Sequence, residues 1–110
     1  MIFEVRVQSA AVEDLDAAFQ YAASHAPVSA ERWLGRFKAA LKTLEHNPER
    51  CPLAAENSRS QRQLHEFLFG KRPFVFRVIF TVDRDCVRIL RICRAKRRPL
   101  KQDELGVSEE

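Results

Sequence analysis

The chain has 110 residues, an ordinary hydrophobic share of 45% and a formal net charge of +4. This length fits one domain with a single modest core. No apolar run approaches the roughly 20 residues of a membrane-spanning helix, and the first residues lack the basic and then apolar layout of a signal peptide, so we expect a cytoplasmic protein without a membrane partner.

The first predicted elements are a strand and a helix. Residues 2–8 alternate between apolar and polar side chains, which is the pattern of a half-buried strand. Ser9 can then cap a helix that ends near His25. The apolar stripe of this helix is Val12, Leu15, Phe19 and Ala22.

A second helix follows after a very short break. Pro27 opens it, either as its first residue or just before a cap at Ser29. Its apolar stripe is Ala30, Trp33, Leu34, Phe37, Leu41 and Leu44, with Trp33 as a packing anchor. Because the connection is so short, the two helices must form an antiparallel hairpin.

The rest of the chain predicts three strands. Residues 47–60 read as an irregular connector and residues 63–69 as a short strand, while 74–82 and 86–93 form a tight antiparallel hairpin. The fold class is therefore α+β in the order β-α-α-β-β-β, with the helical hairpin on one face of a small, mostly antiparallel sheet and the arginines on the other. We expect one domain over residues 1–101 and a loose acidic tail over 102–110.

Neither cysteines nor histidines form a recognisable metal site. The odd count of three cysteines, with Cys86 and Cys93 in or beside apolar strands, favours reduced and buried thiols. The three histidines and Cys51 lack the paired spacings of metal ligands. We expect no metal and no cofactor.

Positive charge is concentrated near the C-terminus. From Arg59 to Lys101 there are thirteen basic and three acidic residues, an excess of ten positive charges. Such a segment attracts polyanions or an acidic protein if folding gathers the charges on one face. Alternation along the last strand predicts Arg88 and Arg94 on one side and Arg91 on the other.

Three stretches together resemble the ParE/RelE toxin superfamily, the toxin half of bacterial type II toxin–antitoxin (plasmid stabilisation) modules. They are AVEDLDAAFQYAA, SAERWLGRFKAALKTLEHNPERCPLAAE and FRVIFTVDRDCVRILRICRAKRR. The resemblance covers nearly the whole chain and implies the same β-α-α-β-β-β order. It also implies a cognate antitoxin as partner in a hetero-oligomer.

The RelE-like branch of this superfamily cuts messenger RNA on the ribosome. Resemblance to it would give Arg77 and Arg97 roles in catalysis, where guanidinium groups stabilise charge but do not shuttle protons. Many such members carry a tyrosine or histidine near the C-terminus, but here the only tyrosine is Tyr21 and no histidine follows His65. His65 and Glu66 remain an alternative proton-transfer pair.

The ParE-like branch resembles inhibitors of DNA gyrase that act by protein contact. The missing acid–base residue favours this branch, with the RelE-like ribonuclease as the alternative. The expected basic face for target or antitoxin comprises Arg72, Arg77, Arg88, Arg94, Lys96, Arg97 and Arg98.

A non-toxic nucleic-acid-binding protein is a third possibility. It would need exposed aromatic rings among the basic residues for base stacking. Phe74, Phe76 and Phe80 instead alternate onto the side of their strand opposite Arg77, which indicates core positions.

Overall fold

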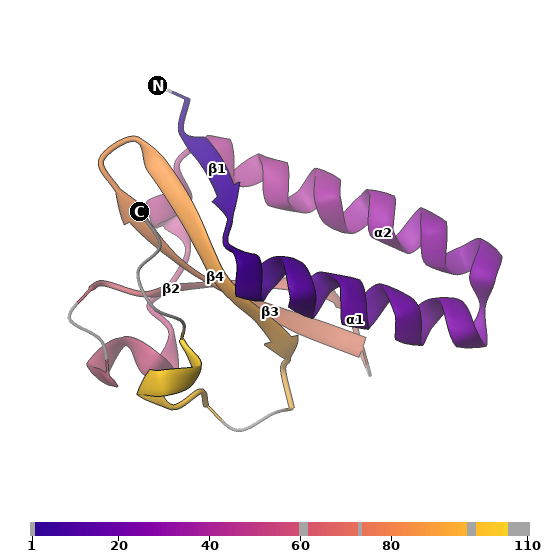
Figure 1. Ribbon diagram of the computed structural model, residues 1–110. Helices are drawn as coiled ribbons and strands as arrows, with labels where there is room; N and C mark the ends of the chain where they lie inside the picture. Colours follow the sequence, from indigo (N-terminus) through magenta and orange to yellow (C-terminus); the bar gives the residue numbers. More distant parts are fainter. Residues whose placement is uncertain (1, 60–61, 73, 97–98, 106–110) are drawn as a thin grey trace.

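The computed structural model describes residues 2–59, 62–72, 74–96 and 99–105. A β-strand comes first, two helices follow, and three further strands complete the sheet (Figure 1). The predicted α+β class and element order are confirmed. Within the described residues no helix has the length and apolar character needed to cross a bilayer.

The sheet has the strand order β1-β4-β3-β2. The first strand, β1 (Glu4–Val7), lies parallel to the last, β4 (Cys86–Arg94). The other neighbours, β3 (Phe74–Asp83) and β2 (His65–Lys71), are antiparallel pairs. Two parallel strands need a long connection between them. The connection from β1 to β4 begins with the two helices.

The two helices are α1 (Ser9–His25) and α2 (Pro27–Lys42), separated only by Ala26. Pro27 is the first residue of α2, which decides between the two predicted starts. Helix α1 already includes Ser9, and its N-cap is Gln8 in extended conformation, so the predicted cap at Ser9 was wrong by one position.

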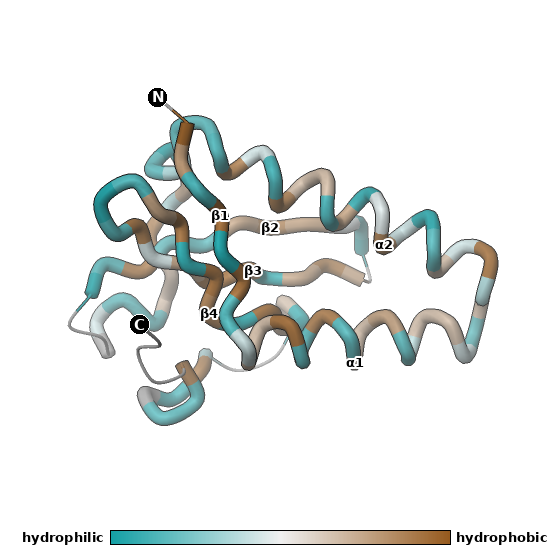
Figure 2. The backbone as a smooth tube through the Cα atoms, turned by 45° about the horizontal axis from the view of Figure 1, so that its top comes forward, coloured by the Kyte–Doolittle hydropathy of each residue, from teal (hydrophilic) through white to brown (hydrophobic). Residues whose placement is uncertain are grey.

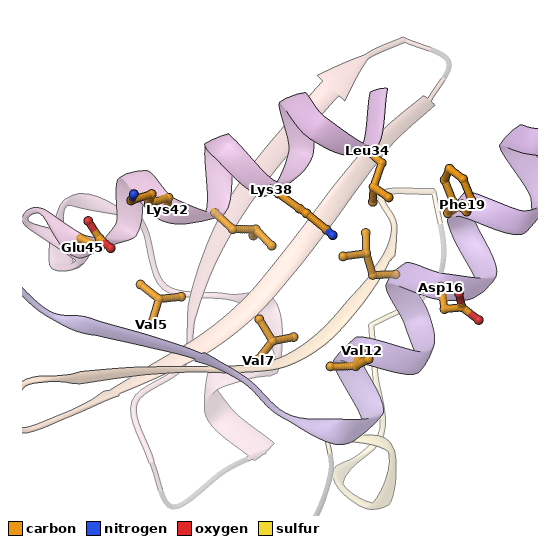
Figure 3. A pocket seen from close by; sticks show the side chains of 11 residues that line it. Val5, Val7, Val12, Asp16, Phe19, Leu34, Lys38, Lys42 and Glu45 are labelled. Carbon is orange, nitrogen blue, oxygen red and sulfur yellow. The ribbon is translucent and has the colours of Figure 1, made fainter. Parts of the chain in front are cut away.

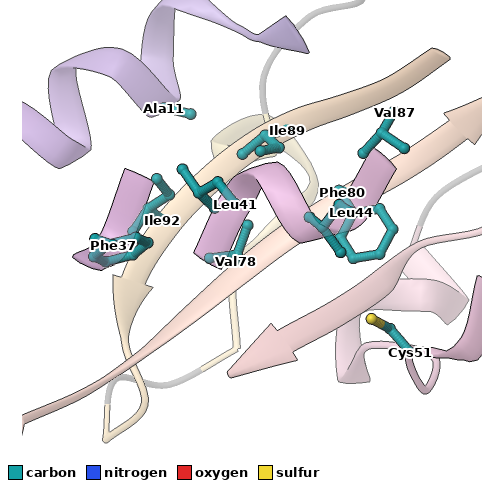
Figure 4. Close-up of a cluster of buried hydrophobic side chains, with 10 residues drawn as sticks. All are labelled: Ala11, Phe37, Leu41, Leu44, Cys51, Val78, Phe80, Val87, Ile89 and Ile92. Carbon is teal, nitrogen blue, oxygen red and sulfur yellow. The ribbon is translucent and has the colours of Figure 1, made fainter. Parts of the chain in front are cut away.

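The main core lies between the helices and one face of the sheet. Figure 4 shows Phe37 and Leu41 of α2, and Leu44 of the 3-10 turn after α2, packed toward strand residues of the sheet, with Ala11 contributed by α1. These strand residues are Val78, Phe80, Val87, Ile89 and Ile92. Apolar residues concentrate along β3 and β4, whereas polar and apolar residues alternate along the helices (Figure 2). Trp33 extends this core with an edge-on contact to Phe37 and tilted contacts to Phe69 and Phe76, which confirms its predicted anchoring role.

The opposite face of the sheet is also covered, contrary to the prediction of an open face of arginines. A second apolar cluster there joins Ile79, Leu90 and Cys93 of the sheet to residues from two irregular segments, Ala54, Leu64, Leu100 and Leu105. These segments contain the short 3-10 helices η3 (Ala55–Arg59) and η4 (Gln102–Glu104). Apolar side chains at alternate strand positions on both faces require burial on both faces.

The predicted loose tail does not begin at residue 102. Residues 102–104 form η4, Leu105 is 5% exposed, and the backbone N–H of Lys101 donates to Glu104 Oε1 at 2.9 Å. Residues 106–110 lie outside the described residues. Leu100 and Leu105, from the described part of the C-terminal segment, belong to the second cluster.

The three cysteines are free and buried, as predicted. Burial raises the pKa of the Cys51 and Cys86 thiols, and neighbouring arginines only partly oppose this effect. Thiols in this state behave as small apolar side chains. Among the described residues no group of three or more His, Cys, Asp or Glu side chains has an arrangement that could hold a metal ion.

Candidate functional site

A groove of about 530 Å3 opens between the two helices beside β1 (Figure 3). Its apolar lining comes from all three elements: Val5, Val7, Val12, Leu15, Phe19, Leu34 and Leu41. Val12 remains 52% exposed. The hairpin therefore does not close over its own apolar stripe, and the groove can receive apolar side chains of a partner.

Charged side chains border this groove. Lys38 and Lys42 come from α2, Asp16 from α1, and Glu45 from the 3-10 turn that follows α2. Figure 3 shows Lys38 reaching into the opening between the helices. An apolar floor with charges at its edge is the arrangement that binds amphipathic segments.

Among the described residues of the predicted basic face, Arg77 is the most enclosed, with 6% of its surface exposed. Its Nη2 donates to Glu56 Oε1 at 2.6 Å, its Nη1 to Glu56 Oε2 at 3.0 Å, and its Nε to Glu66 Oε1 at 2.7 Å. These hydrogen bonds, first those to Glu56, raise the pKa of Arg77 despite burial. Each of the three guanidinium nitrogens therefore donates to a carboxylate of the protein itself.

Glu56 is completely buried and links three parts of the chain. It lies on η3, binds Arg77 on β3, and accepts the backbone N–H of Leu100 on Oε2 at 2.7 Å. Burial by itself would raise the pKa of Glu56, but the hydrogen bonds from Arg77 and Leu100 outweigh it and hold this pKa below its ordinary value. The network therefore fixes the covering segments against the sheet.

Arg91 on β4 also links separate parts of the fold, α1 and η4. Its Nε and Nη2 donate to the Asp14 carboxylate at 2.7 and 2.9 Å, and its Nη1 donates to the Glu104 backbone oxygen at 2.6 Å. Asp14 also accepts the N–H of Ile92. The hydrogen bonds and charge of Asp14 raise the pKa of Arg91 despite its burial. Sequence reasoning missed Asp14, because nothing in an amphipathic helix pattern identifies its partner 77 residues away.

An irregularity between Ile79 and Phe80 separates two arginines that the sequence placed together. Arg88 pairs in register with Thr81, whereas Arg94 pairs with Phe76 across the shift. Cross-strand partners share a face, and Thr81 and Phe76 lie on opposite faces. The predicted common side of Arg88 and Arg94 is therefore wrong, because a bulge inverts the alternation.

The remaining predicted basic residues lie in different surroundings. Arg88 approaches Asp83 at 3.7 Å, and Arg94 lies over the rings of Phe74 and Phe76. Arg72 and Lys96 are exposed in turns at the end of the sheet. Arg97 and Arg98 lie outside the described residues. The structure thus brings Arg72, Arg94 and Lys96 to one end of the sheet and separates them from Arg77.

His65 and Glu66 do not form the proposed proton-transfer pair. The His65 ring stacks on Phe80 and its Nδ1 lies 2.9 Å from the Cys51 backbone oxygen. Glu66 instead binds Arg77 on the opposite face of the sheet. Adjacent strand residues point to opposite faces, which separates these two groups.

The family model for the ParE toxin of the type II toxin–antitoxin system, parDE, matches residues 5–99. This chain belongs to the ParE toxin family. The match includes the groove and the contacts of Arg77 with Glu56 and Glu66, and it ends before Leu100 and η4. The resemblance predicted from the sequence is confirmed for the ParE branch.

A solved structure from the chromosomal ParDE toxin–antitoxin system of P. aeruginosa has a similar fold. Its TM-score is 0.66 at 20% identity, and the alignment covers 86% of this ParE-family chain and 98% of the other. At this identity the likeness supports the shared fold alone. A search of curated proteins finds no match.

Proposed function

We propose that this ParE-family chain is the toxin of a type II toxin–antitoxin module, that it inhibits DNA gyrase by protein contact, and that a cognate antitoxin neutralises it in a hetero-complex. Family membership supports the toxin role. The surroundings of Arg77 favour protein contact over catalysis.

Cleavage of RNA by its 2′-hydroxyl needs a base, an acid and a charged group at the phosphate. Arg77 is the arginine that the RelE-like alternative would use, yet three hydrogen bonds to Glu56 and Glu66 occupy it and burial separates it from solvent. The Glu56 bond to Leu100 keeps the covering segment in place. This enclosure of Arg77 is the observation that carries the proposal.

The first experiment measures supercoiling of relaxed plasmid by gyrase and ATP in the presence of the purified chain. We expect inhibition and accumulation of linear plasmid after protein removal. The same preparation is incubated with translating ribosomes and a labelled messenger RNA, which should remain intact. Cleavage of that RNA with unimpaired gyrase would establish the RelE-like alternative instead.

The groove between the helices supports an antitoxin-binding role. An amphipathic helix could place apolar side chains on the Val5, Leu34 and Phe19 surface and polar ones near Lys38 and Lys42. Such segments are often flexible before binding and order on the partner. We infer that the antitoxin inserts an amphipathic segment here.

Two matched substitutions test this role of the groove. Val12→Glu places a charge in the groove, while Val28→Glu places the same charge at the start of α2, outside the lining, where Val28 is 77% exposed. Each variant is co-expressed with the antitoxin from the adjacent reading frame and captured through a tag. We expect Val12→Glu to lose the antitoxin and Val28→Glu to retain it. Equal retention would place the antitoxin elsewhere.

A further inference from the structure

Strand β2 lies at the edge of the sheet opposite β1, and only the start of its outer side is covered. Its neighbour in the sheet is β3, and the strand order is β1-β4-β3-β2. On the outer side, Leu53 of the preceding connector forms an antiparallel bridge with His65. The Glu66 N–H donates to the Pro52 oxygen at 2.9 Å. The rest of β2 extends beyond this cover.

Pro52 explains why the cover stops at Glu66. In an antiparallel pair, two residues at such positions exchange two hydrogen bonds, one in each direction. Proline has no N–H, so Pro52 accepts from Glu66 but cannot donate to the Glu66 oxygen. That oxygen is therefore the first backbone acceptor on the uncovered part of the strand.

Further backbone groups point outward along the same side. Successive strand residues direct their N–H and C=O groups to opposite edges, so the groups of Leu68 and the Gly70 N–H face outward as the Glu66 N–H does. Within the described residues, no backbone hydrogen bond joins them to another segment. Gly70 has a φ of 109°, which ends the extended run. We call the stretch from the Glu66 oxygen to the Gly70 N–H, roughly 13 Å long, the open edge.

Apolar side chains flank the open edge on both faces of the sheet. Leu68 pairs in register with Arg77 on one face and is 54% exposed. Phe69 lies on the other face, is half-buried, and has its ring centre 6.5 Å from that of Trp33. An added strand would place alternate side chains beside Leu68 and beside Phe69. Apolar residues at those positions would remove exposed apolar surface from water.

Positive charge lies at one end of the open edge. Lys71 and Arg72 follow Gly70 directly, and both side chains are exposed. In the part of the chain that the structure describes, neither belongs to an ion pair. Glu66, at the other end, binds Arg77. A segment antiparallel to β2 would therefore meet complementary charge if its first residues were acidic.

This chemistry suits a polypeptide segment better than a nucleic acid or a second copy of the chain. Backbone donors and acceptors at strand spacing pair with another extended backbone, as in β-strand addition. Two copies would bring together the same cationic residues, Lys71 and Arg72, on chains that each carry a net charge of +4. The connector at Leu53 also limits how far two such edges can overlap.

We propose that the open edge binds an extended, acidic segment of a partner protein as an additional strand. The segment runs antiparallel to β2, with carboxylates near Lys71 and Arg72 and apolar side chains beside Phe69 and Leu68. The partner is a protein other than the antitoxin, because the groove and its β1 wall lie at the opposite edge of the sheet. The inference goes beyond the proposed function and does not require gyrase as the target.

The first test uses the wild-type chain and a fluorescein-labelled peptide, Gly-Asp-Glu-Thr-Val-Ile-Val-Ser, in fluorescence anisotropy. In the proposed register the peptide's Ile N–H faces the Leu68 oxygen, whereas the N–H of the Val before it points away. We expect methylation of the Ile nitrogen to weaken binding by about tenfold or more, and methylation of that Val nitrogen by less than about twofold. Equal weakening by both, or no binding of the parent peptide, would overturn the proposal.

Two substitutions test the same contact from the side of the protein. Leu68→Pro removes the outward N–H without removing a hydrogen bond to β3, and proline is tolerated at such positions of edge strands. Leu68→Thr keeps the N–H and suits a strand. We expect Leu68→Pro to abolish peptide binding and Leu68→Thr to retain it within about threefold, while both variants bind the antitoxin as wild type does. Undiminished peptide binding by Leu68→Pro would contradict the proposal.

A matched pair of variants tests the charge. Lys71→Gln/Arg72→Gln should weaken peptide binding and reduce its dependence on salt. Arg84→Asn/Lys101→Gln removes the same charge from exposed positions elsewhere and should change neither; Asn is chosen because Arg84 has a φ of 61°. Single-stranded DNA of similar length is titrated beside the peptide. Preference for DNA, lost in the first variant, would assign the open edge to nucleic acid and overturn the proposal.

Two further measurements examine the other occupants. Light scattering of the concentrated wild-type chain should show a monomer, and a dimer that Leu68→Pro disrupts would assign the open edge to a second copy. The purified complex with the antitoxin should bind the peptide as the chain alone does, and loss of binding would assign the open edge to the antitoxin. Either contrary result would overturn the proposal.

Failure of this inference is distinguishable from failure of the proposed function. A chain that binds the peptide through the open edge but does not inhibit gyrase would refute the gyrase target and retain the inference. A chain that inhibits gyrase but does not bind the peptide would refute the inference and retain the proposed function.

Discussion

Arg77 and Glu56, 21 positions apart in the chain, form a two-pronged ion pair beneath a covering segment, with N–O distances of 2.6 and 3.0 Å. The sequence placed Arg77 on an open face of the sheet. In the fold, Arg77 on β3 instead binds Glu56 on η3, and Glu56 also accepts the backbone N–H of Leu100. Charged groups this deeply buried are strongly coupled, because removing one leaves the other without compensation.

Arg77→Met is therefore expected to lower the free energy of unfolding by roughly 3–5 kcal/mol, because it leaves the Glu56 carboxylate buried without its main partner. The measurement is urea unfolding followed by circular dichroism. The double variant Arg77→Met/Glu56→Leu should recover part of the loss, since no buried charge remains. A cost for Arg77→Met below about 1 kcal/mol would show that this pair does not hold the covering segment.

The protonation of Glu56 at low pH should contribute to the pH dependence of stability. Its pKa is lowered in the folded protein from an ordinary value of 4.5, so its stabilising contribution is present above pH 4.5 and is lost as the pH falls through the lower folded pKa. Wild type should lose more stability between pH 6 and pH 3 than Glu56→Gln, which cannot titrate there. Glu49→Gln, at an exposed position, is the matched control and should follow the wild-type profile.

Asp14→Ala should weaken the attachment of α1 to the sheet. The substitution removes the two Asp14 carboxylate oxygens, which accept from Arg91 and from the Ile92 N–H, at an expected cost of about 1–3 kcal/mol in unfolding free energy. Hydrogen exchange should show the loss in α1 and in the backbone around Ile92. Glu13→Ala, on the exposed side of the same turn, is expected to change stability by less than about 0.5 kcal/mol.

Two glycines should respond in opposite directions to the same substitution. Gly70 has a φ of 109°, and a Cβ there would lie 2.3 Å from the Phe74 backbone oxygen, so Gly70→Ala should destabilise the β2–β3 turn by roughly 1–3 kcal/mol. Gly35 lies within α2 with no atom within 4 Å of an added Cβ. Gly35→Ala should therefore stabilise the protein by about 0.5–1 kcal/mol in thermal unfolding. Destabilisation by both changes would contradict the expectation that α2 has room for a side chain at Gly35.

The sequence predicted the order of the elements and which side of α2 enters the core. Local signals in the sequence were enough for this. The apolar stripe with Phe37 and Leu41 enters the core, and Pro27 is the first residue of α2, as predicted. The family resemblance rested on the same local features. Periodicity could not reveal the bulge after Ile79, because a single inserted residue alters the register without changing the composition of the strand.

Local pattern determined which residues are apolar, where the helices and strands lie, and how much positive charge the C-terminal half carries. Only the tertiary structure decided how that charge is used. Arg77 and Arg91 pair with carboxylates that are distant in sequence, Glu56 and Asp14, whereas Lys71 and Lys96 remain exposed at the end of the sheet. The physical reason is that charge pairing depends on distance in space and on burial, and neither can be read from spacing along the chain.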